Sequence, residues 1–389
     1  MHRRAAVWLL SALLLVLGCA APGGSAGPGG GAAPRPGAQQ PAAPTASAGA
    51  AASQGSGAAA AASQASGAAP GAQNAPAAAP PLRKIRLALG FLGAEAMPVF
   101  VGLDQGIYRK YGLDVESVVL QSSAQIAPAM SAGEIDIGLS AASGTVDIDL
   151  AGGDQVLVLN HSNILHFQLV GRPEIQRVED LRDKRIAISR LGSSAHFSVQ
   201  VMLERAGLDP VRDVVWAQLG TSDAGLAGLT SGAVDALITS PPHTLLALRQ
   251  GYRLIADTKD YHVNYTQAAM AVTRPTLEAR YDLIRDFLRG HVEAVGLTKR
   301  DRALATRLLG ERNMIDDQEV LDYTYDDWVA VVDPTLVPTV ESVQTVLDQR
   351  APDIPAARTA NARDFIDDRI MRELVASGFV ERMLGPPAH

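Results

Sequence analysis

The stretch GEID at positions 133–136 recurs as GAVD at positions 232–235, which lies 99 positions further along the chain. Each copy precedes a short apolar run that ends in a hydroxyl residue, Ser140 after the first and Thr239 after the second. A glycine followed by this pattern is typical of the end of a helix and the turn that follows it. We therefore interpret these residues as structural, and their duplication predicts two α/β units of similar build in series.

Around both copies, short segments rich in valine, isoleucine and leucine alternate with segments that fit helices. Such short apolar runs are typical of buried strands. The expected strands are 85–92, 113–120, 135–139, 155–160, 167–171, 185–189, 214–219, 236–239, 253–257 and 268–272. The alternation predicts an α/β fold with two lobes, mainly parallel sheets and a ligand cleft between the lobes.

The second unit also contains clear helix signals. A helix is expected over 194–206, because its apolar residues fall on one face. Ser193 or Ser194 would be its N-cap, and Gly207 would follow its C-terminus. A shorter helix is expected to begin at Ser222.

The N-terminus has the pattern of a secretory signal. Arg3 and Arg4 precede an apolar run over 7–17, which is too short to span a bilayer. The run ends at Cys19, the only cysteine in the chain. The sequence VLGC at 16–19 resembles the lipobox of bacterial lipoproteins, in which the cysteine is lipidated. We expect a signal peptide over 1–18 and lipidation at Cys19; the alternative is an ordinary secretory signal with a chance cysteine.

The next segment, 20–81, consists almost entirely of Ala, Gly, Pro, Ser and Gln. It contains no aliphatic side chain larger than alanine or proline and no aromatic one, so it has nothing with which to build a core. A chain of this composition and length has a root-mean-square reach of roughly 45 Å. We expect residues 19–82 to tether the folded body to a membrane through the lipid alone.

Composition excludes several classes of protein for the remaining body. No cysteine follows Cys19, so disulfide scaffolds and thiolate metal sites are excluded. No later apolar run is long enough for a transmembrane bundle. The net charge is −7 without a basic stripe, which argues against a nucleic-acid partner. We expect no metal, no cofactor and no catalytic residue.

Two further stretches carry a family resemblance. GIYRKYGLDVE at 106–116 resembles a signature of ABC-transporter solute-binding proteins for sulfonates, taurine, nitrate and thiamine precursors. VEDLRDKRI at 178–186 resembles the start of the second lobe in that family, with Asp183 where glycine is usual. The resemblance implies a type II periplasmic-binding-protein fold, in which both ends of the chain build lobe one.

From this resemblance we expect lobe one over 83–163 and 272–389 and lobe two over 164–271. The implied function is that of a monomeric, extracytoplasmic, lipid-anchored protein. It would capture a small polar or anionic molecule by lobe closure and deliver it to an ABC permease. Two alternatives remain open: an enzyme of pyrimidine or menaquinone precursor synthesis on the same fold, and a sensor that presents bound ligand to a membrane protein. The lack of cysteine in the body removes the cysteine-rich kind of pyrimidine enzyme.

Ligands of parallel sheets lie beyond the strand carboxyl ends, near helix N-termini. Four loops of the chain follow strands in this way. The candidate ligand-binding residues are Phe91, Leu92, Glu95, Ser140, Ser143, Gly144, Thr145, Gly192, Ser193, Ser194, His196, Ser240 and His243. Serine hydroxyls and free backbone N–H groups on opposite lobes suit an anion or a polar head group.

Several of these residues also have a structural interpretation. Ser143 and Ser193 could simply cap helices, and His196 could lie exposed. For Glu95 a solvated carboxylate at a helix start is the favoured interpretation. A structural role is favoured for His161 and His166, which flank the expected first crossing between the lobes. Core positions are favoured for the tryptophans at 216 and 328.

Overall fold

The computed structural model describes residues 81–120 and 123–385, with the backbone alone at 123 and 124. The expected signal peptide, the lipidated Cys19 and almost all of the expected tether lie outside the described residues. Among the described residues, no helix combines the length and the apolar character needed to cross a bilayer.

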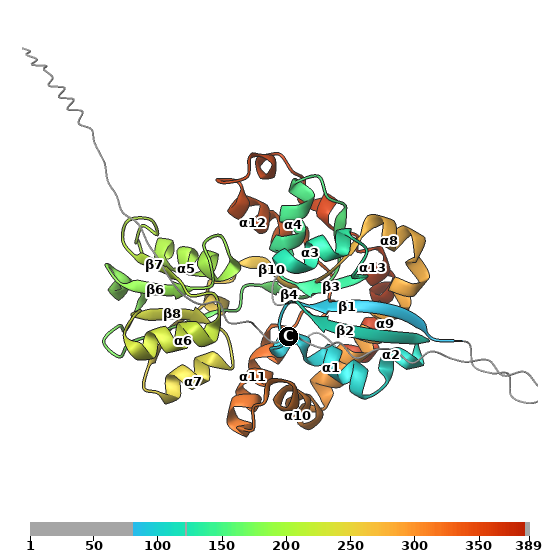
Figure 1. Ribbon diagram of the computed structural model, residues 1–389, viewed down its shortest axis with the longest axis horizontal. Coiled ribbons are helices and arrows are strands. Elements are labelled where there is room, and N and C mark those ends of the chain that lie inside the picture. Colours follow the sequence, from blue (N-terminus) through green and yellow to red (C-terminus); the bar gives the residue numbers. More distant parts are fainter. Residues whose placement is uncertain (1–80, 121–122, 386–389) are drawn as a thin grey trace, which may run out of the picture. The chain divides into compact units, whose positions relative to one another are not determined.

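Ten strands of the described chain form two five-stranded sheets (Figure 1). The first sheet has the order β2-β1-β3-β10-β4. Its strands are β1 (Arg83–Leu89), β2 (Leu113–Val119), β3 (Ile137–Ser140), β4 (Gln155–Ile164) and β10 (Asn264–Thr273). The second sheet has the order β7-β6-β8-β5-β9. Its strands are β5 (Gln168–Gly171), β6 (Arg185–Ile188), β7 (Val215–Gln218), β8 (Ala236–Thr239) and β9 (Arg253–Asp257).

All ten expected strands are confirmed, with ends shifted by a few residues, and each sheet is mainly parallel with one reversed strand, β10 in the first and β5 in the second. In the first sheet β1 runs parallel to β2 and β3, whereas β10 runs antiparallel to β3 and β4. In the second sheet β6 runs parallel to β7 and β8, whereas β5 runs antiparallel to β8 and β9. The reason is that β5 and β10 follow short connections between the sheets, without the helical crossover that parallel pairing needs. β10 therefore joins the first sheet, although most of it falls within 164–271, the range expected for lobe two.

Lobe one denotes the first sheet with the helices packed on it. These helices are α1 (Met97–Asp104), α2 (Ile107–Lys110), α3 (Ser123–Ser131), α4 (Ala142–Leu150), α8 (Arg274–Ala279), α9 (Tyr281–Arg300), α10 (Arg302–Asn313), α11 (Gln318–Val331), α12 (Val340–Arg350), α13 (Arg369–Ala376) and α14 (Phe379–Leu384). Lobe two denotes the second sheet with its helices. These are α5 (Ser194–Arg205), α6 (Ser222–Ser231) and α7 (His243–Arg249). Five short 3₁₀ helices lie at Ala94–Ala96, Val178–Leu181, Thr258–Tyr261, Pro355–Arg358 and Ala362–Phe365.

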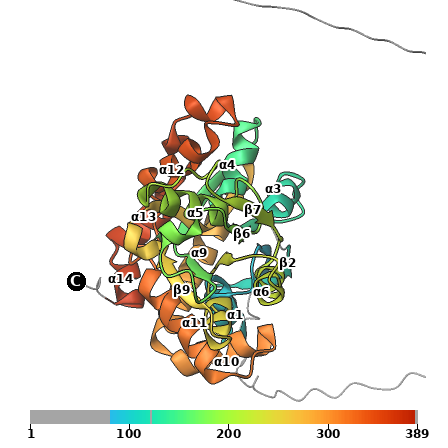
Figure 2. The same ribbon diagram turned by 90° about the vertical axis from the view of Figure 1, so that its left-hand side faces the viewer.

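Each sheet is covered on both faces, which explains its continuous apolar strands. In β1 the side chains of Leu87 and Leu89 enter one core cluster with α1 and α9, whereas Ala88 enters the opposite cluster with α3, α4 and α12. Figures 1 and 2 show α12 and α11 on opposite sides of lobe one. In lobe two, α5 covers one face and α6 and α7 cover the other. The fold class expected from the sequence, α/β with two lobes, is confirmed.

The duplicated stretch has the same hydrogen bonds in both lobes. The carboxylate of Asp136 accepts the backbone N–H of Arg86 at 2.8 Å, and that of Asp235 accepts the N–H of Arg185 at 2.9 Å. Each arginine also donates to the carbonyl of the glycine that opens the stretch. Both glycines have positive φ, and Gly232 is the C-cap of α6. The structural interpretation of these residues is confirmed.

The chain adopts a left-handed backbone conformation in the turn that precedes β6. Asp183 has a φ of 62°, which disfavours residues with a Cβ. We expect Asp183→Gly to raise the free energy of unfolding by about 0.5–1 kcal/mol, because glycine adopts this φ without the Cβ clash. Urea unfolding would measure the gain. Asp183→Ala, which keeps the Cβ, should give none; an equal gain from alanine would assign the effect to the carboxylate.

Candidate functional site

A cavity of about 740 Å³ lies where loops of the two lobes meet. Its lobe-one walls are the loops after β1 and β3, and its lobe-two walls are the loops after β6, β7 and β8. All of these loops leave the carboxyl end of a strand, where ligands of α/β sheets bind. We call this cavity the cleft.

Nine of the thirteen predicted site residues line the cleft. They are Phe91, Leu92, Glu95, Ser140, Ser143, Ser193, Ser194, Ser240 and His243. The other four are absent from its walls. Gly144 and Thr145 are buried one step further into α4, and His196 is buried with its ring edge-on to Trp216. The Nδ1 of His196 accepts the N–H of Gly192 at 3.1 Å, so the structural alternative of an exposed His196 is wrong, and its predicted contact with a ligand stays a prediction.

The hydroxyl of Ser193 is fully engaged within lobe two. It donates to the carbonyl of Arg190 at 2.8 Å and accepts the N–H of His196 at 3.1 Å, which makes it the N-cap of α5. It also accepts the hydroxyl of Ser189 at 3.0 Å. These three bonds use its one donor and both acceptor positions. The cap and the bonds to Arg190 and Ser189 therefore account for the whole hydrogen-bonding capacity of the Ser193 hydroxyl.

Other serine hydroxyls of the cleft are uncommitted. No hydrogen bond joins the hydroxyls of Ser143, Ser194 or Ser240 to another described residue. Ser143 is the second residue of α4 in lobe one, Ser194 begins α5, and Ser240 follows β8 in lobe two. The two lobes thus present free hydroxyls to the same cavity.

These differences predict different effects for two alanine variants. We expect Ser143→Ala to weaken ligand binding by roughly tenfold, the value of one hydrogen bond to a charged group. Ser193→Ala should instead lower the free energy of unfolding by about 1 kcal/mol through the lost cap. Titration calorimetry and urea unfolding of both variants separate the two roles. Equal affinity losses would contradict the assignment of Ser193 as a cap.

Arg190 is a cleft-lining cation that is absent from the predicted set. Its side chain is exposed, and no ion pair joins it to another described residue. Its carbonyl is held by the N–H and the hydroxyl of Ser193. The residue stands at the start of a predicted site loop, so its charge and position were the signal that could have identified it.

The carboxylate of Glu95 is paired rather than solvated, so the interpretation favoured from the sequence is wrong. His166 Nε2 lies 2.8 Å from Glu95 Oε1, and both side chains are largely buried. Burial raises the pKa of Glu95, but the hydrogen bond and charge of His166 outweigh it and hold the pKa below its usual value. Burial lowers the pKa of His166, and Glu95 reverses this to a net rise. The pair is therefore an ion pair in the wall of the cleft.

A second histidine–carboxylate pair lies across the cleft, in lobe two. His243 Nε2 is 2.9 Å from Asp223 Oδ1, and the Asp223 side chain is 89% exposed. Both cleft carboxylates thus have a histidine partner. Among the charged groups of the cleft walls, the guanidinium of Arg190 is the one without an opposite charge beside it in the described chain.

The rest of the cleft wall is largely apolar. Its larger apolar side chains are Phe91, Leu92, Phe167, Pro241, Pro242, Leu246 and Ile315. Gln267 on β10 also lines the cleft, and its Oε1 is buried without a hydrogen-bond partner in the described chain. No sequence pattern marks Gln267, because it lies inside a buried strand. It reaches the cleft because β10 is the strand by which the chain returns from lobe two to lobe one. Its acceptor is available to a ligand.

Structural roles fit the remaining polar candidates. His161 Nε2 lies 2.7 Å from His291 Nε2, and His291 Nδ1 lies 3.0 Å from the Tyr108 hydroxyl, all in the core. Burial lowers the pKa of His161 to about 4, so it stays neutral near pH 7. Trp328 is buried as predicted. The described residues contain no cluster of His, Cys, Asp or Glu arranged to hold a metal ion.

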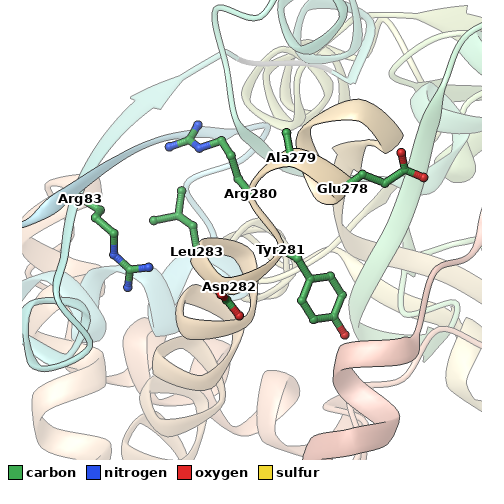
Figure 3. A pocket seen from close by; sticks show the side chains of 7 residues that line it. All are labelled: Arg83, Glu278, Ala279, Arg280, Tyr281, Asp282 and Leu283. Carbon is green, nitrogen blue, oxygen red and sulfur yellow. The ribbon is translucent and has the colours of Figure 1, made fainter.

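A second cavity of about 560 Å³ lies at the start of α9 (Figure 3). Figure 3 shows the side chains of Glu278, Arg280 and Tyr281 pointing in different directions. Its two cations are already paired, Arg83 with Asp286 and Arg280 with Asp136. The two arginines of this cavity are therefore less available to a ligand than Arg190 is in the cleft.

The family profile described as NMT1/THI5-like matches residues 94–301 of the chain. The matched range runs from the first cleft loop to the end of α9. A search of curated proteins finds no match.

Solved structures share the fold. The aliphatic sulphonate-binding protein SsuA of Escherichia coli is 22% identical, with a TM-score of 0.63 over 73% of this chain and 92% of that one. SsuA of Xanthomonas axonopodis pv. citri, bound to MOPS, is 20% identical, with a TM-score of 0.59 over 75% and 97%. The nitrate-binding protein NrtA of Synechocystis is 13% identical, with a TM-score of 0.62 over 80% and 93%. The chain has the fold of the periplasmic binding proteins.

Proposed function

Since this chain belongs to the NMT1/THI5-like family, we propose that it is an extracytoplasmic solute-binding protein that delivers its ligand to an ABC importer. The observation that carries the proposal is the cleft, whose free hydroxyls come from both lobes. A ligand that touches both lobes favours their closed arrangement, because closure is driven by differential affinity. The relatives named as sulphonate- and nitrate-binding proteins support a binding role.

The ligand that best fits the cleft is an organic monoanion. Glu95 is paired with His166, and no carboxylate of the described chain forms an ion pair with Arg190, which leaves the charge of Arg190 to be balanced by the ligand. A cavity of about 740 Å³ is of the size that holds a drug-sized molecule and exceeds the needs of a simple oxyanion. The apolar side chains would pack against an organic part. A sulfonate or carboxylate group bonded to an organic body meets these conditions.

The binding role is preferred over an enzyme or a sensor. The polar groups of the cleft suit hydrogen bonding to a ligand, and in the described chain no cleft serine hydroxyl is hydrogen-bonded to a histidine ring that would activate it as a nucleophile. We also propose that the protein is monomeric and that residues 19–82 tether it to a membrane. A sensor would bind the same ligand, and it would differ in its partner, which co-purification from membranes would identify.

The proposed anchor gives a direct prediction. Cys19→Ala removes the thiol that would carry the lipid, so the full-length variant should move from the membrane to the soluble fraction. Cell fractionation with immunoblotting measures the distribution. Ser11→Ala, within the apolar run, is the control and should leave the protein on the membrane. A Cys19→Ala variant that stays membrane-bound as firmly as the wild type would contradict lipidation at this residue.

Titration calorimetry with MOPS, nitrate and a small amine tests the ligand class. MOPS combines a sulfonate with an organic body, and it is the ligand in the Xanthomonas structure. We expect MOPS to bind, nitrate to bind much more weakly, and the amine not to bind. Tight binding of the amine, with none of MOPS, would contradict the proposed class.

A further inference from the structure

The last two residues of α12, in lobe one, reach across to lobe two. Gln349 Nε2 donates to the carbonyls of Gly192 at 3.0 Å and Ser193 at 3.2 Å. Arg350 Nη1 donates to the same Gly192 carbonyl at 2.5 Å. These acceptors belong to the loop between β6 and α5, which also carries Arg190 and thus forms a wall of the cleft.

Both donors are fixed by further bonds within lobe one. Arg350 is 6% exposed, and its guanidinium holds the carboxylate of Asp147 with bonds of 2.6 and 3.2 Å. Asp147 lies on α4, one turn after the cleft residue Ser143. The Oε1 of Gln349 accepts the hydroxyl of Tyr265 on β10 at 2.9 Å. One guanidinium therefore ties a cleft wall of lobe one to a cleft wall of lobe two.

We infer that Gln349 and Arg350 are positioning residues that hold the two lobes closed around the cleft. We call these residues, with Asp147 and the Gly192 carbonyl, the clasp. The inference rests on the proposed function, because it assigns the control of closure at the same site. Opening the lobes has to break the bonds to the Gly192 and Ser193 carbonyls, so the clasp raises ligand affinity without touching the ligand.

Another contact between the lobes has a different character. Arg249 on α7 pairs with Asp317 and Glu319 at the start of α11, and the side chains of all three are about a third or more exposed. Exposed ion pairs of this kind contribute little to stability. The clasp is buried at Arg350 and uses directional bonds to backbone carbonyls, so it should resist opening more strongly than the Arg249 ion pairs do.

The test variant is Gln349→Glu. It keeps an acceptor for the Tyr265 hydroxyl but replaces the Nε2 donor with a carboxylate oxygen facing two carbonyls. The matched control is Gln344→Glu, which makes the same change on the exposed side of α12, where the glutamine bonds only to Asp348. Arg350→Lys, which cannot bond Asp147 and Gly192 in the same fork geometry, is the second variant if Gln349→Glu does not fold.

The readouts are an interlobe distance and an affinity. The full chain with Cys19→Ser has no native thiol, so spin labels can be placed at Glu341→Cys on α12 and Val211→Cys on lobe two. Glu341 is exposed, and Val211 is 83% exposed. Double electron–electron resonance without ligand gives the distance, and calorimetry gives the affinity for MOPS.

We expect Gln349→Glu to lengthen the mean distance without ligand and to weaken MOPS binding by about tenfold. Gln344→Glu should change neither. A distance distribution and an affinity of Gln349→Glu equal to those of Gln344→Glu would overturn the inference. If the wild type does not bind MOPS, the proposed ligand class fails, and the distance without ligand still decides the clasp.

Discussion

Replacing Arg190 with glutamate is expected to weaken the binding of a monoanionic ligand by more than about a hundredfold. A hydrogen bond to a charged group contributes about 1.5–3 kcal/mol, which corresponds to roughly 10- to 150-fold in affinity. Glutamate also places a negative charge next to the anion, so the loss should exceed that of Arg190→Ala. Titration calorimetry with MOPS measures both variants.

The matched control is Arg253→Glu, at the start of β9 in the same lobe. Arg253 is exposed and lies outside the cleft. Its replacement by glutamate changes the net charge by the same amount as Arg190→Glu does. It should leave the affinity within about twofold, because solvent and salt screen an exposed charge that does not touch the ligand. Equal losses in both variants would mean that Arg190 acts through net charge alone, and no loss in either would place the anion elsewhere.

Removing His166 is expected to produce the largest loss of stability. His166→Ala leaves the Glu95 carboxylate buried without its partner, and breaking a buried ion pair costs about 3–5 kcal/mol. The exposed fractions are 4% for the His166 side chain and 18% for that of Glu95, so solvent cannot replace the lost bond fully. Urea unfolding at pH 5.5 measures the difference.

The pair across the cleft supplies the control. His243→Ala removes the same kind of partner from Asp223, whose side chain is 89% exposed. Water can solvate that carboxylate, so the loss should stay within about 1 kcal/mol. Equal losses from His166→Ala and His243→Ala would contradict the assignment of a buried ion pair at Glu95.

The loss from His166→Ala should depend on pH in a defined way. The pKa of His166 is raised above its ordinary value of 6.5, so its share of the stability is complete below 6.5 and disappears as the pH rises through the folded-state pKa. The pKa of Glu95 is lowered from 4.5, so its share is complete above 4.5 and disappears as the pH falls through its folded-state pKa. The difference from wild type should therefore be largest between 4.5 and 6.5. A difference that grows steadily toward pH 9 would contradict this linkage.

The sequence predicted the positions of the strands well, because each is a short apolar run bounded by turns. It predicted their directions less well. β5 and β10 contain the same kind of residues as parallel strands, and nothing local to them shows that the chain passes directly between sheets. Direction depends on the connection, which is a property of the whole topology.

For the site as well, the sequence predicted some residues and missed others. Ser143 and Glu95 were identified because they follow strands, and strand carboxyl ends meet at one edge of a sheet. The partner of Glu95 lies 71 positions away at His166, so its burial and charge could not be derived from neighbours in sequence. Gln267 and the clasp residue Arg350 reach the cleft region from strand and helix positions that carry no motif.

Ligand enrichment shows whether the cleft captures an organic anion. Wild type and Arg190→Glu, both full length, would be incubated with a small-molecule extract of the native cells, isolated again and denatured. Mass spectrometry of the released compounds should show one organic anion, near one per chain, on the wild type and little or none on the variant. If both proteins retain the same compounds in the same amounts, the cleft is not the site that captures them.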